Sequence, residues 1–578
     1  MSRVGLIHSV AIACMLLLGA SVAAAPVGSP DSATRAPVQA GFFEQLDLSP
    51  LDGVAVWQEG RFKSFESAAR STLGYISGPR SPGLLPHRVA LLDLAIRPEA
   101  WIDVDLHWVK KKPLRAEIIR VLRDAAARPA IATDDRLQRF FDTGLAPRVF
   151  LEDPAVVRLL ADLQLDVLRF ARPVEAIQTS LLVARPEVLR LQLTLVPPVG
   201  ADAASMPWTT LDQSVTGDPD GPVATAWRSM EAGWRTGDAA LVNAAAVKLA
   251  VALRAINLEL YPSEGRMESE SLYFRLGGFT KSWMLYLASI IALLMWIVYR
   301  WRGALYTGYV LFLLAFALHT TAVFMRMYIA DRWPNTNMFE AVTTSTWFGG
   351  VFVLLVEPWL CRTRMAGLFV LGAAGCAMVA LMAAHLDPVN LNMNISNRMP
   401  VLHDVWLYIH TNVIIFSYVL IFLASVTGLI YLVRRIAQRL MHKPVDASRE
   451  WARAGGAGFL IVPRVKGQTA LRADSTSFGQ VLDGATMILV ELAMILLWSG
   501  LAMGAIWADH SWGRPWGWDP KEVFALESFF IFAILVHVRL TADDKGWWTA
   551  VLSVIACAAM IFNWIIINFT ISGLHSYA

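Results

Sequence analysis

Hydrophobic and polar residues are distributed differently in the two halves of this chain. After about residue 280 the sequence is dominated by apolar runs, each close to the roughly 20 residues that a helix needs to cross a bilayer. Short polar segments separate these runs. The pattern predicts eight membrane-spanning helices, at about 283–299, 304–327, 340–358, 366–386, 407–433, 481–506, 524–541 and 547–570.

The positions of lysine and arginine indicate how these spans are oriented. The basic clusters fall in alternate connections, at 299–302, 362–364, 434–443 and 539–545. Because short loops rich in Lys and Arg stay on the cytoplasmic side, we expect the chain to enter its first span from outside and to end outside. The periplasmic face then receives the polar segments 331–340, 387–407, 507–523 and 571–578.

The first 280 residues have the pattern of a leader followed by a soluble region. Arg3, an apolar run over about 10–20 and small residues ending at Ala25 are typical of a secretory signal peptide; an uncleaved anchor is the alternative. Residues 26–280 carry mixed charge and several stretches of helical apolar spacing. The expected fold is therefore an α-helical polytopic membrane protein, with its spans in residues 281–578 and a mostly α-helical periplasmic region before them.

Composition supports a membrane location and excludes several kinds of chemistry. Of the 578 residues, 56% are hydrophobic and only 17% are charged, and the mean hydropathy is +0.47. A net charge of +3 gives no basic footprint for nucleic acid. Cys14, Cys361, Cys376 and Cys557 form no CxxC pair, which argues against a thiol-redox motif and a zinc knuckle.

One polar segment has a composition that calls for a functional explanation. Trp512, Trp516 and Trp518 lie within seven residues, interleaved with Gly and Pro and followed by Asp519 and Glu522. Gly and Pro favour a loop over a regular helix. An ordinary interfacial aromatic belt is one interpretation. The other is a platform of flat rings for a large planar apolar ligand, with charges at its edge.

Several motifs, in order along the chain, resemble those of a known family. The run 512–522, Trp-Gly-x-x-Trp-x-Trp-Asp-Pro-Lys-Glu, is similar to the tryptophan-rich WWD signature of haem-handling proteins. The segments 332–340 and 399–410 and the ending 573–578, Gly-Leu-His-Ser-Tyr-Ala, resemble the CcsA/ResC branch of the system II cytochrome c synthase. The resemblance covers about 283–578. Phe524 departs from it, because the family usually has Trp there.

The resemblance implies a function, a cargo and partners. It implies delivery of haem b, held non-covalently in transit, to apocytochrome c with a CxxCH motif at the periplasmic face of the bacterial inner membrane. It further implies a ResB-like membrane subunit, with which the chain would form a thioether-forming lyase. A system I subunit of the CcmC or CcmF kind, and a transporter of another amphipathic solute, are the alternatives.

Two histidines are candidates for the axial ligands of that haem. His410 begins the fifth span at its outer end and His575 follows the outer end of the eighth, so both face the tryptophan loop in the predicted topology. Neutral imidazole is a common axial ligand of haem iron. By resemblance these two residues match the family's periplasmic ligands, with Trp512, Trp516, Trp518 and Asp519 completing the binding site.

A third histidine lies deeper in the membrane. His537 stands in the seventh span, about 20 Å from its outer end. The resemblance implies that it ligates an inner haem on its way outward, whereas a satisfied interhelical hydrogen bond is the alternative. His319 in the second span lies at a different depth, so we expect it to be structural or a relay and the second inner ligand to come from the partner subunit.

Overall fold

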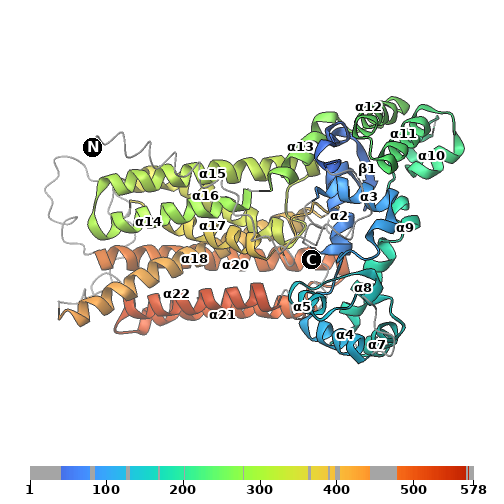
Figure 1. Ribbon diagram of the computed structural model, residues 1–578. Helices are drawn as coiled ribbons and strands as arrows, with labels where there is room; N and C mark the ends of the chain where they lie inside the picture. Colours follow the sequence, from blue (N-terminus) through green and yellow to red (C-terminus); the bar gives the residue numbers. More distant parts are fainter. Residues whose placement is uncertain are drawn as a thin grey trace, which may run out of the picture. The chain divides into compact units, whose positions relative to one another are not determined.

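The structure is a computed structural model, which describes residues 41–78, 85–124, 131–166, 169–200, 202–277, 279–361, 366–387, 391–397, 404–442, 478–567 and 571. The signal peptide predicted at 1–25 and the predicted ligand His575 lie outside these residues. The chain divides into two compact units, one that ends at Leu276 and one that begins at Gly277. Each unit is described by itself (Figure 1).

The N-terminal unit is mostly helical, with two small antiparallel hairpins. β1 (Ala55–Gln58) pairs with β2 (Arg61–Ser64), and β3 (His107–Trp108) with β4 (Leu145–Ala146). The helices are α2 (Phe65–Ser77), α3 (His87–Ile96), α4 (Lys112–Asp124), α5 (Asp134–Thr143), α6 (Arg148–Leu151), α7 (Pro154–Gln164), α8 (Ala171–Val183), α9 (Pro186–Leu191), α10 (Leu211–Gly217), α11 (Pro222–Thr236), α12 (Ala239–Ile256) and α13 (Glu264–Leu276).

A buried carboxylate ties three elements of this unit together. Asp93 in α3 is 1% exposed and accepts hydrogen bonds from Arg97, from the Trp101 indole at 3.0 Å and from the Trp234 indole at 2.8 Å. A buried charge is costly unless it is paired and hydrogen-bonded, and here both carboxylate oxygens are satisfied. The network therefore joins α3 to α11 inside the larger of the two hydrophobic cores in the unit.

The second unit is a bundle of long helices. They are α14 (Trp283–Tyr299), α15 (Arg302–Ala330), α16 (Met338–Leu360), α17 (Leu368–Leu386), α18 (Val405–Leu440), α20 (Phe478–Trp512), α21 (Pro520–Thr541) and α22 (Lys545–Phe562), the last followed by a π-helical turn, η9 (Asn563–Ile567). Figure 1 shows them running side by side. This arrangement confirms the polytopic helical fold expected from the apolar runs.

Eight helices in the described part of the chain are long and apolar enough to cross a membrane. Seven of them overlap the predicted spans in this bundle, although α17 begins at Leu368 and α22 ends at Phe562, short of the predicted limits 366 and 570. The eighth is α12, whose inner face packs in the core of the N-terminal unit. The remaining predicted span, 524–541, lies in α21, a helix of 22 residues packed against α20 and α22. The long α18 and α20 extend beyond their predicted spans at both ends.

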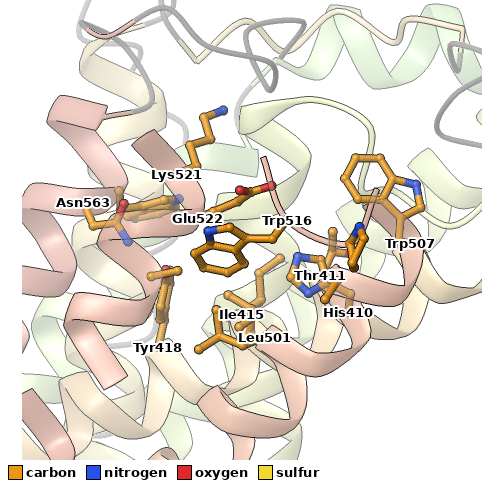
Figure 2. A pocket seen from close by; sticks show the side chains of 16 residues that line it. His410, Thr411, Ile415, Tyr418, Leu501, Trp507, Trp516, Lys521, Glu522 and Asn563 are labelled. Atoms are coloured by element: carbon orange, nitrogen blue, oxygen red, sulfur yellow. The ribbon is translucent and has the colours of Figure 1, made fainter. Parts of the chain in front are cut away.

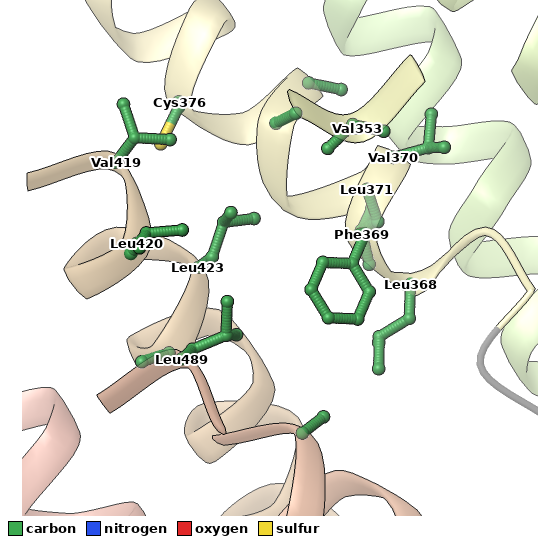
Figure 3. Close-up of a cluster of buried hydrophobic side chains, with 14 of the residues drawn as sticks. Val353, Leu368, Phe369, Val370, Leu371, Cys376, Val419, Leu420, Leu423 and Leu489 are labelled. Atoms are coloured by element: carbon green, nitrogen blue, oxygen red, sulfur yellow. The ribbon is translucent and has the colours of Figure 1, made fainter. Parts of the chain in front are cut away.

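Small residues allow the bundle helices to approach closely. A Cβ on Gly372 would lie 2.1 Å from Leu423, and one on Gly428 would lie 2.4 Å from the Ser553 hydroxyl. In a membrane, where the hydrophobic effect does not drive helices together, this close packing is a main source of association. Figure 3 shows the apolar side chains from α16, α17, α18 and α20 that fill the interior.

A buried ion network joins the α15–α16 connection to the α17–α18 connection. Glu340 is fully buried and pairs with Arg326 at 2.7 Å and with Arg332 at 2.9 Å. The two guanidinium groups also donate to the backbone oxygens of Met393, Asn394 and Ser396. The carboxylate thus holds the segment 391–397 against the helix ends, which explains the charged residues of the motif at 332–340.

Candidate functional site

A cavity of about 250 Å³ opens at the end of the bundle where α18 begins and α20 ends. Figure 2 shows side chains from four helices and the tryptophan loop converging on it. The lining consists of His410, Thr411, Ile414, Ile415 and Tyr418 from α18, Leu501, Gly504, Ala505 and Trp507 from α20, Pro515 and Trp516 from the loop, Lys521, Glu522 and Ala525 from α21, and Asn563 and Trp564 from η9.

The backbone of α20 orients the His410 ring in this cavity. His410 Nδ1 lies 2.7 Å from the carbonyl oxygen of Gly500. Since a carbonyl only accepts, Nδ1 carries the proton and the lone pair resides on Nε2, which is the tautomer that ligates a metal through Nε2. Gly504 leaves room for the ring, because a Cβ there would lie 2.7 Å from its Cε1 atom. Gly500 and Gly504 therefore fix the orientation and the position of the His410 ring.

The tryptophan loop is shaped by the first turn of α21. Asp519 caps this helix and Glu522 completes a capping box, while Pro520 occupies the first helical position. The Glu522 carboxylate accepts the Gly517 amide at 2.8 Å and the Asp519 amide at 3.2 Å. Asp519 and Glu522 therefore accept hydrogen bonds from backbone amides of the loop and of the first turn of α21.

The three tryptophans of the loop do not form one flat wall. Trp516 lines the cavity. Trp518 is 76% exposed and its ring stands at 90° to that of Trp516. Trp512 packs edge-on against Trp507, with ring centroids 4.8 Å apart. The cavity is lined instead by Trp516 together with Trp507 and Trp564, which come from α20 and η9.

Comparison with known sequences identifies the bundle. Residues 283–575 match the sequence model of the family described as cytochrome C assembly protein. The chain belongs to this family. The assembly protein family match covers half of the chain and includes the cavity, its histidine and the tryptophan loop.

Individual relatives of this assembly protein agree with the family match. The sequence is 30% identical over 278 residues to cytochrome c biogenesis protein CcsA of Parasynechococcus marenigrum, covering 47% of this chain and 87% of that protein. It is 26% identical over 269 residues to CcsA of Microcystis aeruginosa, covering 43% and 80%. Protein NrfI of Wolinella succinogenes is 27% identical over 337 residues, which is 55% of this chain but 32% of NrfI.

His537 of this assembly protein lies away from the cavity. Its side chain is exposed on α21, and Nδ1 lies 2.7 Å from the carbonyl oxygen of Ala533 in the same helix. The alternative role for His537 was a hydrogen bond to another helix. The hydrogen bond that its ring makes lies within α21. The ring is exposed at the surface of the bundle.

His319 is buried and satisfied within the bundle. Its Nε2 atom lies 3.0 Å from the Thr343 carbonyl oxygen, and Nδ1 lies 3.4 Å from the Tyr286 hydroxyl. Both ring nitrogens have protein partners, so its position indicates a structural role in joining α14, α15 and α16.

No group of three or more His, Cys, Asp or Glu side chains is placed to hold a metal ion in the described part of this assembly protein. Haem iron makes a different demand, since the porphyrin provides four of its ligands and the protein only the axial ones. A single oriented imidazole beside an aromatic-lined cavity fits that demand.

The cavity lining includes polar and aromatic residues that the sequence-based site lacked, four of which could contact a ligand through an aromatic ring or an amide. Trp507 and Trp564 lie outside the tryptophan motif, and Tyr418 and Asn563 are polar residues inside apolar runs. Polar residues in a membrane helix usually face the bundle interior, which is the signal that could have pointed to Tyr418 and Asn563. Nothing in the local sequence distinguishes the two tryptophans.

Proposed function

We propose that this chain receives haem b and presents it for covalent attachment to apocytochrome c at the periplasmic face of the bacterial inner membrane, as a subunit of a system II cytochrome c synthase. The observation that carries the proposal is His410, whose Nδ1–H bond to Gly500 leaves the lone pair on Nε2 beside a cavity lined by Trp516. The relatives named for cytochrome c biogenesis add support.

His410 is the first axial ligand in this proposal. The Gly500 carbonyl accepts its Nδ1–H and thereby increases the basicity of Nε2, as outer-sphere partners of metal-ligating histidines commonly do. Trp516, Trp507 and Trp564 supply the apolar surface against which the macrocycle packs. Trp512 and Trp518 extend that surface at the rim.

His575 is the second axial ligand in this proposal. It follows the last span by a few residues, so the predicted topology puts it on the same side as the tryptophan loop. The histidine of the incoming CxxCH motif then displaces one of the two ligands, which releases the product.

The attachment itself needs no nucleophile from this chain. Each cysteine thiol of the client adds across one vinyl group, forming one C–S and one C–H bond, so the step balances without an oxidant. What this chain contributes is position, and holding reactants in place can reduce a barrier by about 7–11 kcal/mol.

A ResB-like subunit completes the assembly in this proposal. His537 ligates an inner haem with a second ligand from that subunit, because its ring is exposed on α21. The N-terminal unit and the tryptophan loop both face the periplasm, after export directed by the leader at 1–25. An exposed ionisable ring within a membrane helix requires such a partner.

The visible spectrum of the purified protein tests this proposal. Wild type is expected to show low-spin bis-histidine bands in both oxidation states. His410→Ala is expected to retain little haem and to regain part of it when imidazole is added, since imidazole can fill the vacated position. His510→Ala is the matched control, because His510 is half exposed, lies 3.3 Å from Asp404 and is absent from the cavity lining. Wild-type protein without a Soret band would refute the proposal, as would unchanged haem content in a His410→Ala, His575→Ala double variant.

A further inference from the structure

The cavity contains a polar side chain that nothing so far explains. Asn563 is only 6% exposed and lines the cavity. Its amide has no hydrogen-bond partner within the described residues. A buried amide costs free energy unless it is hydrogen-bonded, and because this one faces the cavity, its natural partner is a bound ligand.

A second polar group lies level with it. Gly428 of α18 contacts Ser553 of α22. The two helices run antiparallel, so ten residues along each from this contact, about 15 Å, place Tyr418 and Asn563 at the same height in the bundle. Tyr418 also lines the cavity, and no hydrogen bond joins its hydroxyl to a described residue. In Figure 2 both residues lie on the side of the Trp516 indole away from His410.

The backbone at Asn563 is distorted. The α-helix α22 ends at Phe562, and Asn563–Ile567 form a π-helical turn. Such turns are rare and are often found at functional sites, where they redirect side chains. Here the turn brings both Asn563 and Trp564 to the cavity lining.

The two groups have the chemistry to bind a carboxylate. An amide N–H and a phenol O–H are both donors, and hydrogen bonds to a charged acceptor are stronger than neutral ones. Lys521 belongs to the same lining, with its ammonium group directed away from the Trp516 indole in Figure 2. Glu522, the acidic residue of the lining, already accepts two backbone amides of the loop.

We propose that Asn563 and Tyr418 bind the carboxylate-bearing edge of the cavity's ligand; for haem, as the proposed function requires, this edge carries the propionates. Tyr418 is eight residues beyond His410 along α18, or about 12 Å, so this polar pair forms the floor of the cavity. The vinyl groups occupy the opposite edge of the macrocycle and then point toward the mouth, where a client peptide arrives.

Haem and its dimethyl ester, compared as ligands, test this orientation. The ester keeps the iron and the ring but has no carboxylate. Wild type is expected to bind haem at least about tenfold more tightly than the ester, the loss expected for a hydrogen bond to a charged group. Asn563→Leu and Tyr418→Phe should reduce that preference while leaving the positions of the His410-dependent absorption bands unchanged.

The matched control is Asn412→Leu. Asn412 lies in α18, donates to the Tyr408 carbonyl oxygen at 2.8 Å and is absent from the cavity lining. The Asn412→Leu variant should keep the full preference for haem over the ester. Should Asn563→Leu fail to fold, Tyr418→Phe, which removes one oxygen, carries the test.

The outcomes separate this inference from the proposed function. An equal preference for haem in wild type, Asn563→Leu and Tyr418→Phe would refute carboxylate binding by Asn563 and Tyr418. It would not affect the proposal that His410 ligates the iron. No preference in wild type would refute carboxylate binding as well. Failure of wild type to bind either compound would reject the proposed function itself.

Discussion

At the scale of single residues, the site depends on how one imidazole is seated. The Gly500 carbonyl accepts the Nδ1–H of His410, and the missing side chain of Gly504 leaves space for the ring. Neither glycine stood out in the sequence, because a glycine within an apolar run has several explanations. The role of Gly504 becomes clear only in the structure, where a Cβ at this position would collide with the His410 ring.

Gly504→Ala is expected to weaken haem retention. The new Cβ would lie 2.7 Å from His410 Cε1 and 2.9 Å from Nδ1, so the ring must move and its bond to Gly500 must lengthen. We expect a several-fold drop in haem per protein, measured as the pyridine haemochrome. Gly375→Ala is the control, since a Cβ there would make an ordinary 3.4 Å contact with Phe422. Equal haem content in the two variants would contradict the role of Gly504 in positioning the His410 ring.

His107 makes the N-terminal unit sensitive to acid. Its ring is buried, and Nδ1 donates to Ser180 Oγ at 2.7 Å, because the Ser180 proton is given to the Ile76 carbonyl. Burial, aided by nearby Arg148, lowers the pKa of His107 to about 4 from the ordinary 6.5. Between these values the unfolded chain binds more protons than the folded one, so stability falls as the pH falls from about 6.5 to 4.

This shift is worth up to about 3 kcal/mol below pH 4. The full chain in detergent is expected to show a falling Tm of the N-terminal unit between pH 6.5 and 4.5, followed by tryptophan fluorescence. His107→Gln removes the titrating group and should flatten that dependence. If the Tm of the His107→Gln variant falls with pH as steeply as that of wild type, groups other than His107 cause the acid sensitivity.

At the scale of elements, the tryptophan loop is held by the helix that follows it. Asp519 and Glu522 cap α21, and Gly513 and Trp518 adopt left-handed backbone conformations with φ near +69° and +55°. Glycine accepts such a φ without strain, whereas a tryptophan does so only when its surroundings enforce it. The capping box is one such constraint, because Glu522 holds the amides on either side of Trp518.

Substitutions at Asp519 distinguish its cap from its charge. Asp519→Ala removes the cap, should cost about 1 kcal/mol in the first turn of α21, and should lower haem retention as Trp516 loses its position. Asp519→Asn keeps an acceptor oxygen and should retain haem like wild type. Spectra of both purified variants decide between them, because an Asn variant as defective as the Ala variant would mean that the carboxylate charge acts on the ligand.

At the scale of the whole molecule, the proposed site needs two residues that lie far apart in the bundle sequence. His410 lies near the start of α18, and His575 lies 165 residues later in the chain. A chain that ends before His575 should insert normally, because every span precedes it, yet it should not mature cytochromes c.

Deletion of residues 575–578 tests this requirement. Membrane insertion, judged by the amount of full-length bundle in the membrane fraction, is expected to match wild type, while covalent haem staining of client cytochromes should disappear. A deletion that removes only Ala578 is the control. Normal maturation without His575 would remove it from the site.

The sequence by itself determined the helices, their number in the bundle and the family. Each span is recorded in the length of its own apolar run, and the motif at 512–522 is contiguous, so neither requires knowledge of the rest of the chain. These properties are local, which is why a linear pattern reports them.

Only the tertiary structure decided which side chains share the cavity. His410 meets a carbonyl 90 residues away, and Trp516 faces the cavity while its neighbour Trp518 is 76% exposed. Asn563 and Tyr418 come from η9 and α18 and line the same cavity, although 145 residues separate them in the sequence. Such pairings depend on the rotation and register of packed helices, which are set by contacts between distant residues rather than by any single segment.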